Sequence, residues 1–499
     1  MAKKFNALQF TISFFLFLLW MLSSCTKEFY YDKNEPILKF SEDSILFDTV
    51  FTTIGSATQS IKIYNPTNEF VKIQRIYIPN SQNSKFSLNV DGFSGKDFQD
   101  IVIRPKDSIY LFCEVLINPN DPISSSPFII LDSVVFEVNK SVQKVILEAW
   151  GQNAIYIPAK SNKANFAIID LKGKTELWND QKPYILYGIV LFRNGTLKIE
   201  PGTKIHVFGG ITKAIDSEGN TFFYNDGRLL IGQNANIICN GTLEKNIVFQ
   251  GVRLEEQFKS IRGQWSTISI IEGSLGNEFH HTTILNNQIG VTIDSSCSCD
   301  FFSCKIYNNS IYGIYSNAGN LYAENCLFYN QGLNSLVSEN GGSIVFNYTT
   351  FANYGNMESA VIISNFKCVD PVECLTKTYY PLDAKFTNCI FTGEADDEFW
   401  MESVSNAEFN VALDHCFINS KKIKEKDYFP NFVTQFTQNC IFNSNQIKLF
   451  KNSSKENFQL DTLSSLENRA IPIAGISKDL LGKTRDQVMP DIGCYEYEK

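Results

Sequence analysis

The sequence has no excess of positive charge, because 53 Asp and Glu residues outnumber 44 Lys and Arg and give a net charge of −9. Proteins that hold a phosphate backbone need a basic surface. A nucleic-acid partner is therefore not expected. Histidine is also scarce, with 4 residues in 499, so few imidazoles could serve as metal ligands or acid–base groups.

A long membrane-spanning run is missing from the N-terminal region as well. The apolar stretch Phe10 to Leu22 has 13 residues, whereas a transmembrane helix needs about 20. A run of this length behind Lys3 and Lys4 is typical of a signal peptide. It ends in Leu22-Ser-Ser-Cys25, which resembles the lipobox of bacterial lipoproteins.

That resemblance implies that residues 1–24 are removed and that Cys25 carries a lipid anchor, followed by a tether over residues 25–35. Each buried CH₂ of such an anchor contributes roughly 0.8 kcal/mol to membrane binding. Thr26, in place of Asp, resembles the sorting signal for the outer membrane, and Lys27-Glu28 resembles surface-export signals of Bacteroidetes lipoproteins; a periplasmic orientation stays open. The alternative is an ordinary signal peptide with a chance cysteine.

Residues 36–153 lack helical periodicity and show short alternating runs instead. These runs cover residues 60–66, 71–78, 108–117, 132–138 and 144–151, with Pro, Asn, Asp and Gly between them. Such spacing predicts a β-sandwich. The order of "FDTVFTTIGS", "IYNPTN", "IRPKDS" and "EAWGQNA" resembles immunoglobulin-like domains at the front of Bacteroidetes surface proteins. We expect a spacer or docking domain without chemistry of its own.

The rest of the chain repeats itself. Residues 195–205 and 227–237 share one pattern, and a regular array follows in which a small residue recurs in steps of 22, 22, 23, 40, 27 and 24. The small-residue column is Thr282, Cys304, Cys326, Thr349, Cys389, Cys416 and Cys440. An Ile or Phe stands two positions later in every copy, and the first four copies then carry Asn286, Asn308, Asn330 and Asn353. A 22-residue repeat with period-2 alternation predicts a parallel β-helix over residues 154–478.

These columns are best explained structurally. Small Cys or Thr and larger Ile or Phe side chains would fill the interior, while the Asn amides would bond to one another at a turn. Thiolates for a metal were the alternative, but Cys297-Ser-Cys299 has no second ligand pair at zinc spacing. Cys368 and Cys374 lie in the long 40-residue step and could form a disulfide. No metal site is expected.

The coil length and columns resemble the right-handed parallel β-helices of the pectate-lyase-like superfamily. The stretches "KPYILYG", "LKIEPGT", "GTLEKNIVF" and "GQW" (starting at residues 182, 197, 241 and 263) resemble those of a subgroup of Bacteroidetes lipoproteins with an immunoglobulin-like front. The tail, residues 479–499 with "DLLGKTR" and "DIGCYE", resembles the end of choice-of-anchor Q proteins. There it caps the last coil. The whole chain is thus expected to be all-β, a sandwich followed by a right-handed parallel β-helix.

The family's catalytic motifs (Asn-Thr-Asp, paired Asp-Asp, Gly-His-Gly and Arg-x-Pro-x-x-Arg) are not at matching positions. Asp414 and His415 are the weak catalytic candidates, and the acidic run 394–398 with Trp400 could bind calcium or a sugar. Exposed polar positions explain both more simply. Outward positions of the array would carry neutral groups such as Tyr307, Tyr315, Asn317, Tyr329 and Asn347.

Three functions compete. The first is a non-catalytic, surface-anchored lipoprotein whose β-helix binds a glycan or a protein. The second is a divergent polysaccharide lyase or glycoside hydrolase, and the third is an accessory subunit of an outer-membrane assembly. No cofactor is required by any of them, although calcium would suit a lyase.

Overall fold

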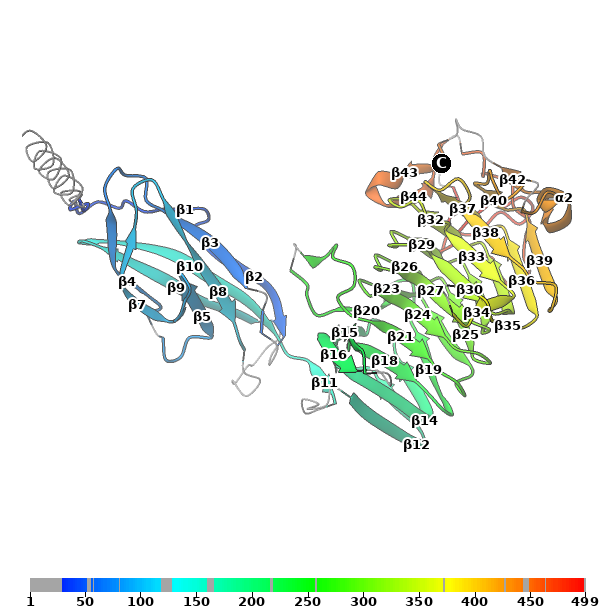
Figure 1. Ribbon diagram of the computed structural model, residues 1–499, viewed down its shortest axis with the longest axis horizontal. Coiled ribbons are helices and arrows are strands. Elements are labelled where there is room, and N and C mark those ends of the chain that lie inside the picture. Colours follow the sequence, from blue (N-terminus) through cyan, green and yellow to red (C-terminus); the bar gives the residue numbers. More distant parts are fainter. Residues whose placement is uncertain are drawn as a thin grey trace, which may run out of the picture. The chain divides into compact units, whose positions relative to one another are not determined.

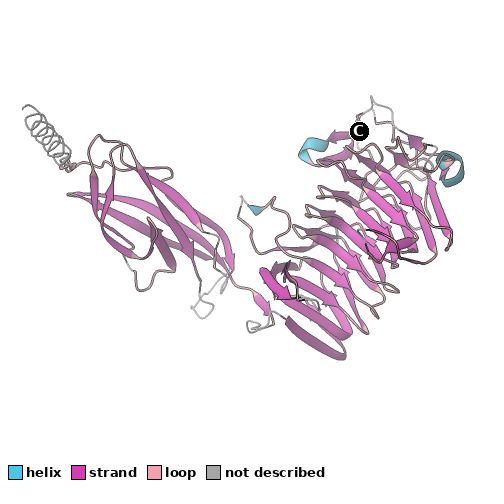
Figure 2. Cartoon of the chain, viewed as in Figure 1, coloured by secondary structure: helices cyan, strands magenta, loops and turns pink. Residues whose placement is uncertain are grey.

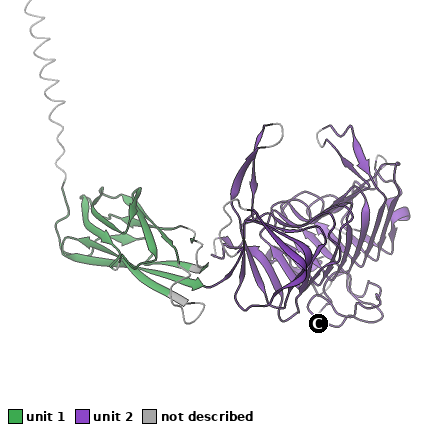
Figure 3. Cartoon of the chain, turned by 90° about the horizontal axis from the view of Figure 1, so that it is seen from below, with its two compact units in different colours: residues 1–152 green, residues 153–499 purple. Residues whose placement is uncertain are grey.

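The structure is a computed structural model. It describes residues 29–51, 55–56, 58–79, 81–117, 128–158, 166–215, 219–255, 258–370, 373–425, 428–442, 448–462 and 464–497, without the side chains of 48, 49, 128 and 129. The signal segment and Cys25 lie outside these residues. The chain divides into two compact units, residues 1–152 and 153–499 (Figure 3). No helix in the described ranges is both long and apolar enough to cross a membrane.

Unit 1 consists of two five-stranded sheets around one apolar core. The first sheet has the order β1-β3-β8-β5-β6, with β1 (Lys39–Phe40), β3 (Gln59–Tyr64), β5 (Phe86–Val90), β6 (Phe93–Gly95) and β8 (Ser108–Val115). The second has the order β2-β10-β9-β4-β7, with β2 (Ser44–Phe51), β4 (Val71–Tyr77), β7 (Asp97–Ile103), β9 (Phe128–Val138) and β10 (Ser141–Gln152). In β3, Ile61 and Ile63 are buried while Tyr64 is exposed. This alternation gives each strand one core face.

Unit 2 is built from two long parallel sheets (Figures 1 and 2). The 11-stranded sheet contains β11 (Ile155–Ile157), β13 (Tyr184–Tyr187), β15 (Lys204–Phe208), β20 (Ile247–Gly251), β23 (Thr282–Leu285), β26 (Lys305–Tyr307), β29 (Leu327–Tyr329), β32 (Thr350–Asn353), β37 (Ile390–Gly393), β40 (Phe417–Ile418) and β42 (Ile441–Phe442).

The 17-stranded sheet opens with β12 (Phe166–Trp178) and β14 (Ile189–Ile199) and continues as two series. The first series is β18 (Arg228–Ile231), β21 (Thr267–Ile270), β24 (Ile289–Ile293), β27 (Tyr312–Asn317), β30 (Leu336–Glu339), β33 (Val361–Ser364) and β38 (Phe399–Glu402). The second series is β19 (Ala235–Asn240), β22 (Asn277–His280), β25 (Ser298–Phe302), β28 (Asn320–Glu324), β31 (Gly342–Asn347), β36 (Leu382–Thr387), β39 (Phe409–Asp414) and β41 (Thr437–Gln438).

From β18 to β40, each coil contributes one strand to each series and one to the 11-stranded sheet. The expected all-β fold with long parallel sheets, as in a β-helix, is confirmed. Ile284, Ile306, Phe328 and Phe351 lie in register on adjacent strands, so the apolar column read from the sequence is one continuous row of the core. The rings of Phe328 and Phe351 stack with centroids 5.0 Å apart.

Insertions leave the stack at its corners and do not disturb the register. The hairpin β16 (Ile211–Ile215) and β17 (Thr221–Asn225) follows β15, and the hairpin β34 (Phe366–Cys368) and β35 (Lys377–Tyr379) follows β33. The second hairpin accounts for the 40-residue step, and a disulfide joins Cys368 to Cys374 within it. Helix α2 (Phe432–Phe436) precedes β41.

The C-terminal segment lies along the outside of the 11-stranded sheet, which corrects the expectation of a cap on the last coil. After the short hairpin β43 (Phe450–Asn452) and β44 (Asn457–Leu460), with η2 (Ser453–Lys455) between them, the chain bonds to several earlier coils. Gly493 N–H donates to Asn388 O, and Cys494 N–H donates to Thr350 Oγ1. A second apolar cluster is buried beneath this segment and includes Leu327, Ile390 and Phe417.

Candidate functional site

The small-residue column turns the chain at the corner between the second series and the 11-stranded sheet. All of its members are buried except the partly exposed Cys440. Cys304 Sγ donates to Phe279 O at 3.1 Å, and Cys389 Sγ donates to Phe346 O at 3.3 Å, so the thiol bonds a carbonyl of the preceding coil. The hydroxyl of Thr282 donates to His280 O instead. A small side chain with one donor is what this corner requires.

The Asn column forms a ladder over three coils. Asn308 Nδ2 donates to Asn286 Oδ1 at 2.6 Å, and Asn330 Nδ2 donates to Asn308 Oδ1 at 3.0 Å. All three residues have positive φ, which Asn tolerates well. Asn353 differs: its φ is not positive, and its amide donates to Leu333 O and Glu358 O.

Asp414 and His415 form a local pair. His415 Nδ1 lies 2.7 Å from Asp414 Oδ1, and His415 occupies the left-handed corner position with φ 49°. In register with Asp414, the neighbouring coils carry Thr387 and Gln438. At these two described register positions there is no second carboxylate, and the pair is a corner histidine beside its own carboxylate partner.

The acidic run 394–398 joins coils together. Asp396 forms ion pairs with Lys421 and Lys422, and buried Asp397 accepts N–H bonds from Lys421, Lys422 and Ile423 of the next coil.

Glu398 is fully buried in the same loop. Its two carboxyl oxygens accept the N–H groups of Ala395 and of Ala360, the latter one coil earlier. Burial raises the pKa of Glu398 to about 8 against the opposing effect of these two bonds. Asp396, Asp397 and Glu398 of the run therefore tie adjacent coils together.

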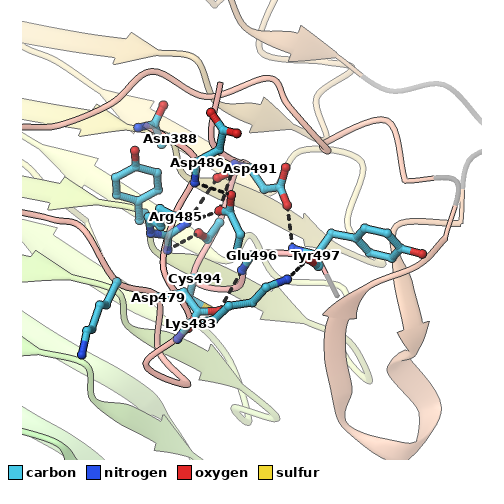
Figure 4. A network of polar contacts seen from close by, with 12 residues as sticks. Asn388, Asp479, Lys483, Arg485, Asp486, Asp491, Cys494, Glu496 and Tyr497 are labelled. Atoms are coloured by element: carbon cyan, nitrogen blue, oxygen red, sulfur yellow. Dashed lines mark hydrogen bonds and ion pairs between the residues drawn. The ribbon is translucent and has the colours of Figure 1, made fainter. Parts of the chain in front are cut away.

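The tail carries a dense polar network, shown in Figure 4. Arg485 is 1% exposed and lies over the ring of Tyr348 at 3.9 Å. Its Nη2 donates to Asn325 Oδ1 at 2.8 Å and Gly493 O at 3.0 Å, while Nη1 contacts Glu496 Oε2 at 3.3 Å.

The acids around Arg485 are bonded to the backbone of the tail. Asp491 accepts N–H bonds from Asn468 and Tyr497, and Asp479 accepts those of Leu481, Lys483 and Glu496. Burial raises the pKa of Asp491 to about 6. Because its carboxylates are bonded within the tail, this network fastens the segment to the sheet and offers no reactive group to a ligand.

The outward face of the second series brings carboxylates from successive coils together. Glu278 on β22 lies in register with Asp300 on β25, and Asp300 in register with Tyr322 on β28. His280 Nε2 is 3.1 Å from Glu278 Oε2. Burial, and then the charge of Glu278, raise the pKa of Asp300. All four side chains remain partly accessible to solvent.

A second outward row runs beside the first, two residues further along each strand. His280, Phe302 and Glu324 lie in register, and the His280 and Phe302 rings stack with centroids 4.4 Å apart. Tyr322 OH donates to Glu324 Oε2 at 2.8 Å, and its pKa rises to about 12 through burial and this bond. We call the set Glu278, His280, Asp300, Phe302, Tyr322 and Glu324 the acid–aromatic face.

The expectation of a neutral outward face was wrong here. The signal was present in the sequence, because Glu278 and Asp300 are one 22-residue step apart, as are Phe302 and Glu324. It was missed because neither outward row keeps one residue type: Tyr322 follows Asp300 in the first row, and Glu324 follows Phe302 in the second. No group of three or more His, Cys, Asp or Glu side chains in the described part of the chain is arranged to hold a metal ion.

The tyrosines expected on the outward face have other roles. The rings of Tyr307 and Tyr329 stack with centroids 4.5 Å apart, and the ring of Phe458 on β44 packs against Tyr329. Tyr315 OH bonds to Glu339, whose Oε1 lies 2.8 Å from Lys367 Nζ on hairpin β34–β35. This cluster fixes the hairpin against the first series. Asn317 accepts a bond from Asn340, and Asn347 donates to Tyr322 at 3.5 Å.

No family model matches the sequence, and no curated protein matches it. Among solved structures, the complex of XylC with xylose is similar with a TM-score of 0.29 and 10% identity, over 95% of this chain and 92% of that one. The catalytic unit of a GH87 α-1,3-glucanase from Streptomyces thermodiastaticus gives 0.23 and 8%, over 71% and 73%. A PapD-like domain of human CEP192 gives 0.17 and 11%, over 26% and 96%. Scores this low carry no argument about function.

Proposed function

We propose that unit 2 is a non-catalytic glycan-binding scaffold and that the acid–aromatic face is its binding surface. The observation that carries the proposal is the convergence of three carboxylates with stacked rings on three successive coils. Carboxylate oxygens accept hydrogen bonds from sugar hydroxyls, and these charge-assisted bonds are stronger than neutral ones. The groups recur at a strand spacing of about 4.8 Å, so an extended chain that lies along the stack would meet them at regular intervals.

The negative charge of this face determines which class of glycan, acidic, neutral or amino-bearing, it can bind. Of the six described residues that form this face, Glu278, Asp300 and Glu324 are acidic, and His280 is the one that could carry a positive charge. An acidic polysaccharide would meet like charges, whereas a neutral or amino-bearing chain would not. We therefore infer that the ligand is a neutral or amino-sugar polysaccharide, and that pectin and alginate are poor ligands.

The test compares oligosaccharide binding by calorimetry for the mature chain and for Glu278→Gln and Asp300→Asn. Glu176→Gln, an exposed carboxylate on β12, is the matched control. We expect neutral or amino-sugar oligomers to bind, and each face variant to weaken binding about tenfold, as losing a bond to a charged group does. Equal binding by all variants, or preferential binding of polygalacturonate, would refute this assignment.

A second candidate function is glycoside hydrolysis on the same face. It is favoured by the raised pKa of Asp300, which lies beside Glu278 of the preceding coil, since glycosidases pair a protonated carboxyl with an ionised one. New reducing ends that appear with the wild type but not with Asp300→Asn would establish hydrolysis. For pectin, alginate and other acidic glycans we expect no cleavage, with or without calcium.

We further propose that the protein is an outer-membrane lipoprotein, with an immunoglobulin-like unit 1 as spacer and a right-handed β-helix as unit 2. The lipobox-like Leu22-Ser-Ser-Cys25 supports the anchor, and the two facing sheets of unit 1 support the spacer. Cys25→Ser should leave the protein unprocessed or release it from the membrane fraction. If that variant still enters detergent as a lipidated species, the anchor lies elsewhere. Co-purification with outer-membrane proteins would instead favour an accessory-subunit role.

A further inference from the structure

A separate cleft lies at the corner between the second series and the 11-stranded sheet, where the tail meets that sheet. Its volume is about 250 Å³. It is lined by Thr242, Leu243, Asn246, His281, Thr283, Ser303, Lys305, Leu480 and Leu481. Leu243 and Leu481 are 43% and 44% exposed, while Leu480 is buried. The cleft therefore has an apolar rim formed by a turn of the stack and by the tail.

The outward side chains of the 11-stranded sheet change from mostly apolar to polar at the cleft. One outward row of the 11-stranded sheet runs through Thr283, Lys305, Leu327, Thr350, Ile390 and Phe417. The last four are buried beneath the tail. Thr283 and Lys305, which line the cleft, are the polar members at its open end. The tail thus covers the mostly apolar part of this row, from Leu327 to Phe417. The cleft lies over the polar part, which carries the cation Lys305.

The charge inside the cleft is positive. Within the described residues, no ion pair or hydrogen bond joins the Lys305 ammonium to another side chain. Burial and the neighbouring His280 lower the pKa of His281, so its imidazole is neutral at neutral pH. Ser303 and Thr283 add hydroxyls, and Asn246 Nδ2 donates to Thr283 Oγ1 at 3.3 Å. Glu244, in the adjoining turn, is the acidic group that acts on His281.

We propose that this cleft binds a small organic anion, a single carboxylate or sulfate carried on a body no larger than one sugar residue. Lys305 would contact the anionic oxygens, the hydroxyls of Ser303 and Thr283 would donate to them, and the leucines would contact the carbon frame. The volume excludes a polymer along its length but admits the end or a side group of one. The proposal does not depend on the acid–aromatic face, which lies on the 17-stranded sheet.

The experiment measures binding of sodium glucuronate, glucose and sodium sulfate to the mature chain by calorimetry or NMR titration. We expect glucuronate to bind at least ten times more tightly than glucose. Competition by sulfate at equal concentration would show that the anionic group alone is recognised. Failure of sulfate to compete would assign the site to the sugar acid as a whole.

Two variants locate the site. Lys305→Met removes the charge and keeps the length of the chain, and Leu243→Trp narrows the rim without changing the charge; each should weaken glucuronate binding at least tenfold. Lys174→Met, an exposed residue on β12, is the control and should bind as the wild type does. Binding unchanged in both cleft variants, or absent from a wild type whose glycan binding is intact, would overturn the proposal.

Discussion

Replacing Arg485 by Met should detach the tail from the sheet while the coils stay folded. The side chain of Arg485 joins the tail to Asn325 on the stack, 160 positions earlier in the chain. Met has a similar length and lacks every donor. The substitution leaves Glu496 without its cationic partner and leaves the carbonyl of Gly493 without one of its donors.

The expected cost follows from the burial of this site. Removing one partner of a buried, hydrogen-bonded ion pair costs about 3–5 kcal/mol. Since each 1.4 kcal/mol is a factor of ten, the population of the detached tail should rise between about one hundred and a few thousand fold. Arg469→Met is the matched control, because Arg469 lies in the same segment and is exposed.

Cys494 provides the assay. It belongs to the tail and is fully buried against the sheet, and burial raises the pKa of its thiol to about 12, so it should react slowly with an alkylating agent. When opening and closing are faster than alkylation, the rate follows the open population. Peptide mapping should therefore show faster labelling of Cys494 in Arg485→Met by at least one hundred fold, with Cys304 unchanged. Labelling of Cys494 within threefold of the control would refute this account of the tail.

Two further predictions concern the stack. Asn308→Ala should destabilise unit 2 by about 2–4 kcal/mol in urea unfolding, because it loses two ladder bonds and places Ala at φ 58°, which costs about 1–2 kcal/mol. Asn308→Gly should recover the backbone part, and equal losses for Ala and Gly would contradict the role of the left-handed turn. For Glu398, the folded pKa of about 8 exceeds the unfolded value near 4.3. Its contribution to stability should therefore be full below about pH 4 and be lost as the pH rises through about 8. Unfolding free energies at pH 6 and pH 9 should differ less in Glu398→Gln than in the wild type, and identical pH dependence would show that Glu398 does not titrate in this range.

The repetitive part of the fold could be predicted because identical coils place equivalent residues in one row. Ile306 and Phe328 are 22 residues apart in sequence and directly in register in space, so the period itself reports a contact. Unit 1 could be read in a similar way, since strands such as β3 keep a strict alternation between buried Ile63 and exposed Tyr64.

The position of the tail could not be read from the sequence. Its contacts pair Arg485 with Asn325 and Cys494 with Thr350, residues that no local pattern connects. The acid–aromatic face could not be predicted from the sequence for another reason. Core rows repeat the same residue type because stacking demands it, whereas an outward row such as Glu278, Asp300 and Tyr322 is free to vary. A repeat in the sequence therefore predicts the core rows of a β-helix more readily than its outward-facing rows.

The corners of the coils can accept inserted sequence without disturbing the strand register. The hairpin β34–β35 separates β33 from β36, yet Gly342 still pairs with Leu382 and Val361 with Phe399 as if nothing intervened. A loop inserted there alters neither the core rows nor the pairing of the following strands. The corners are thus points where new sequence can be added or exchanged at little cost to folding, by natural selection or by grafting a foreign binding loop.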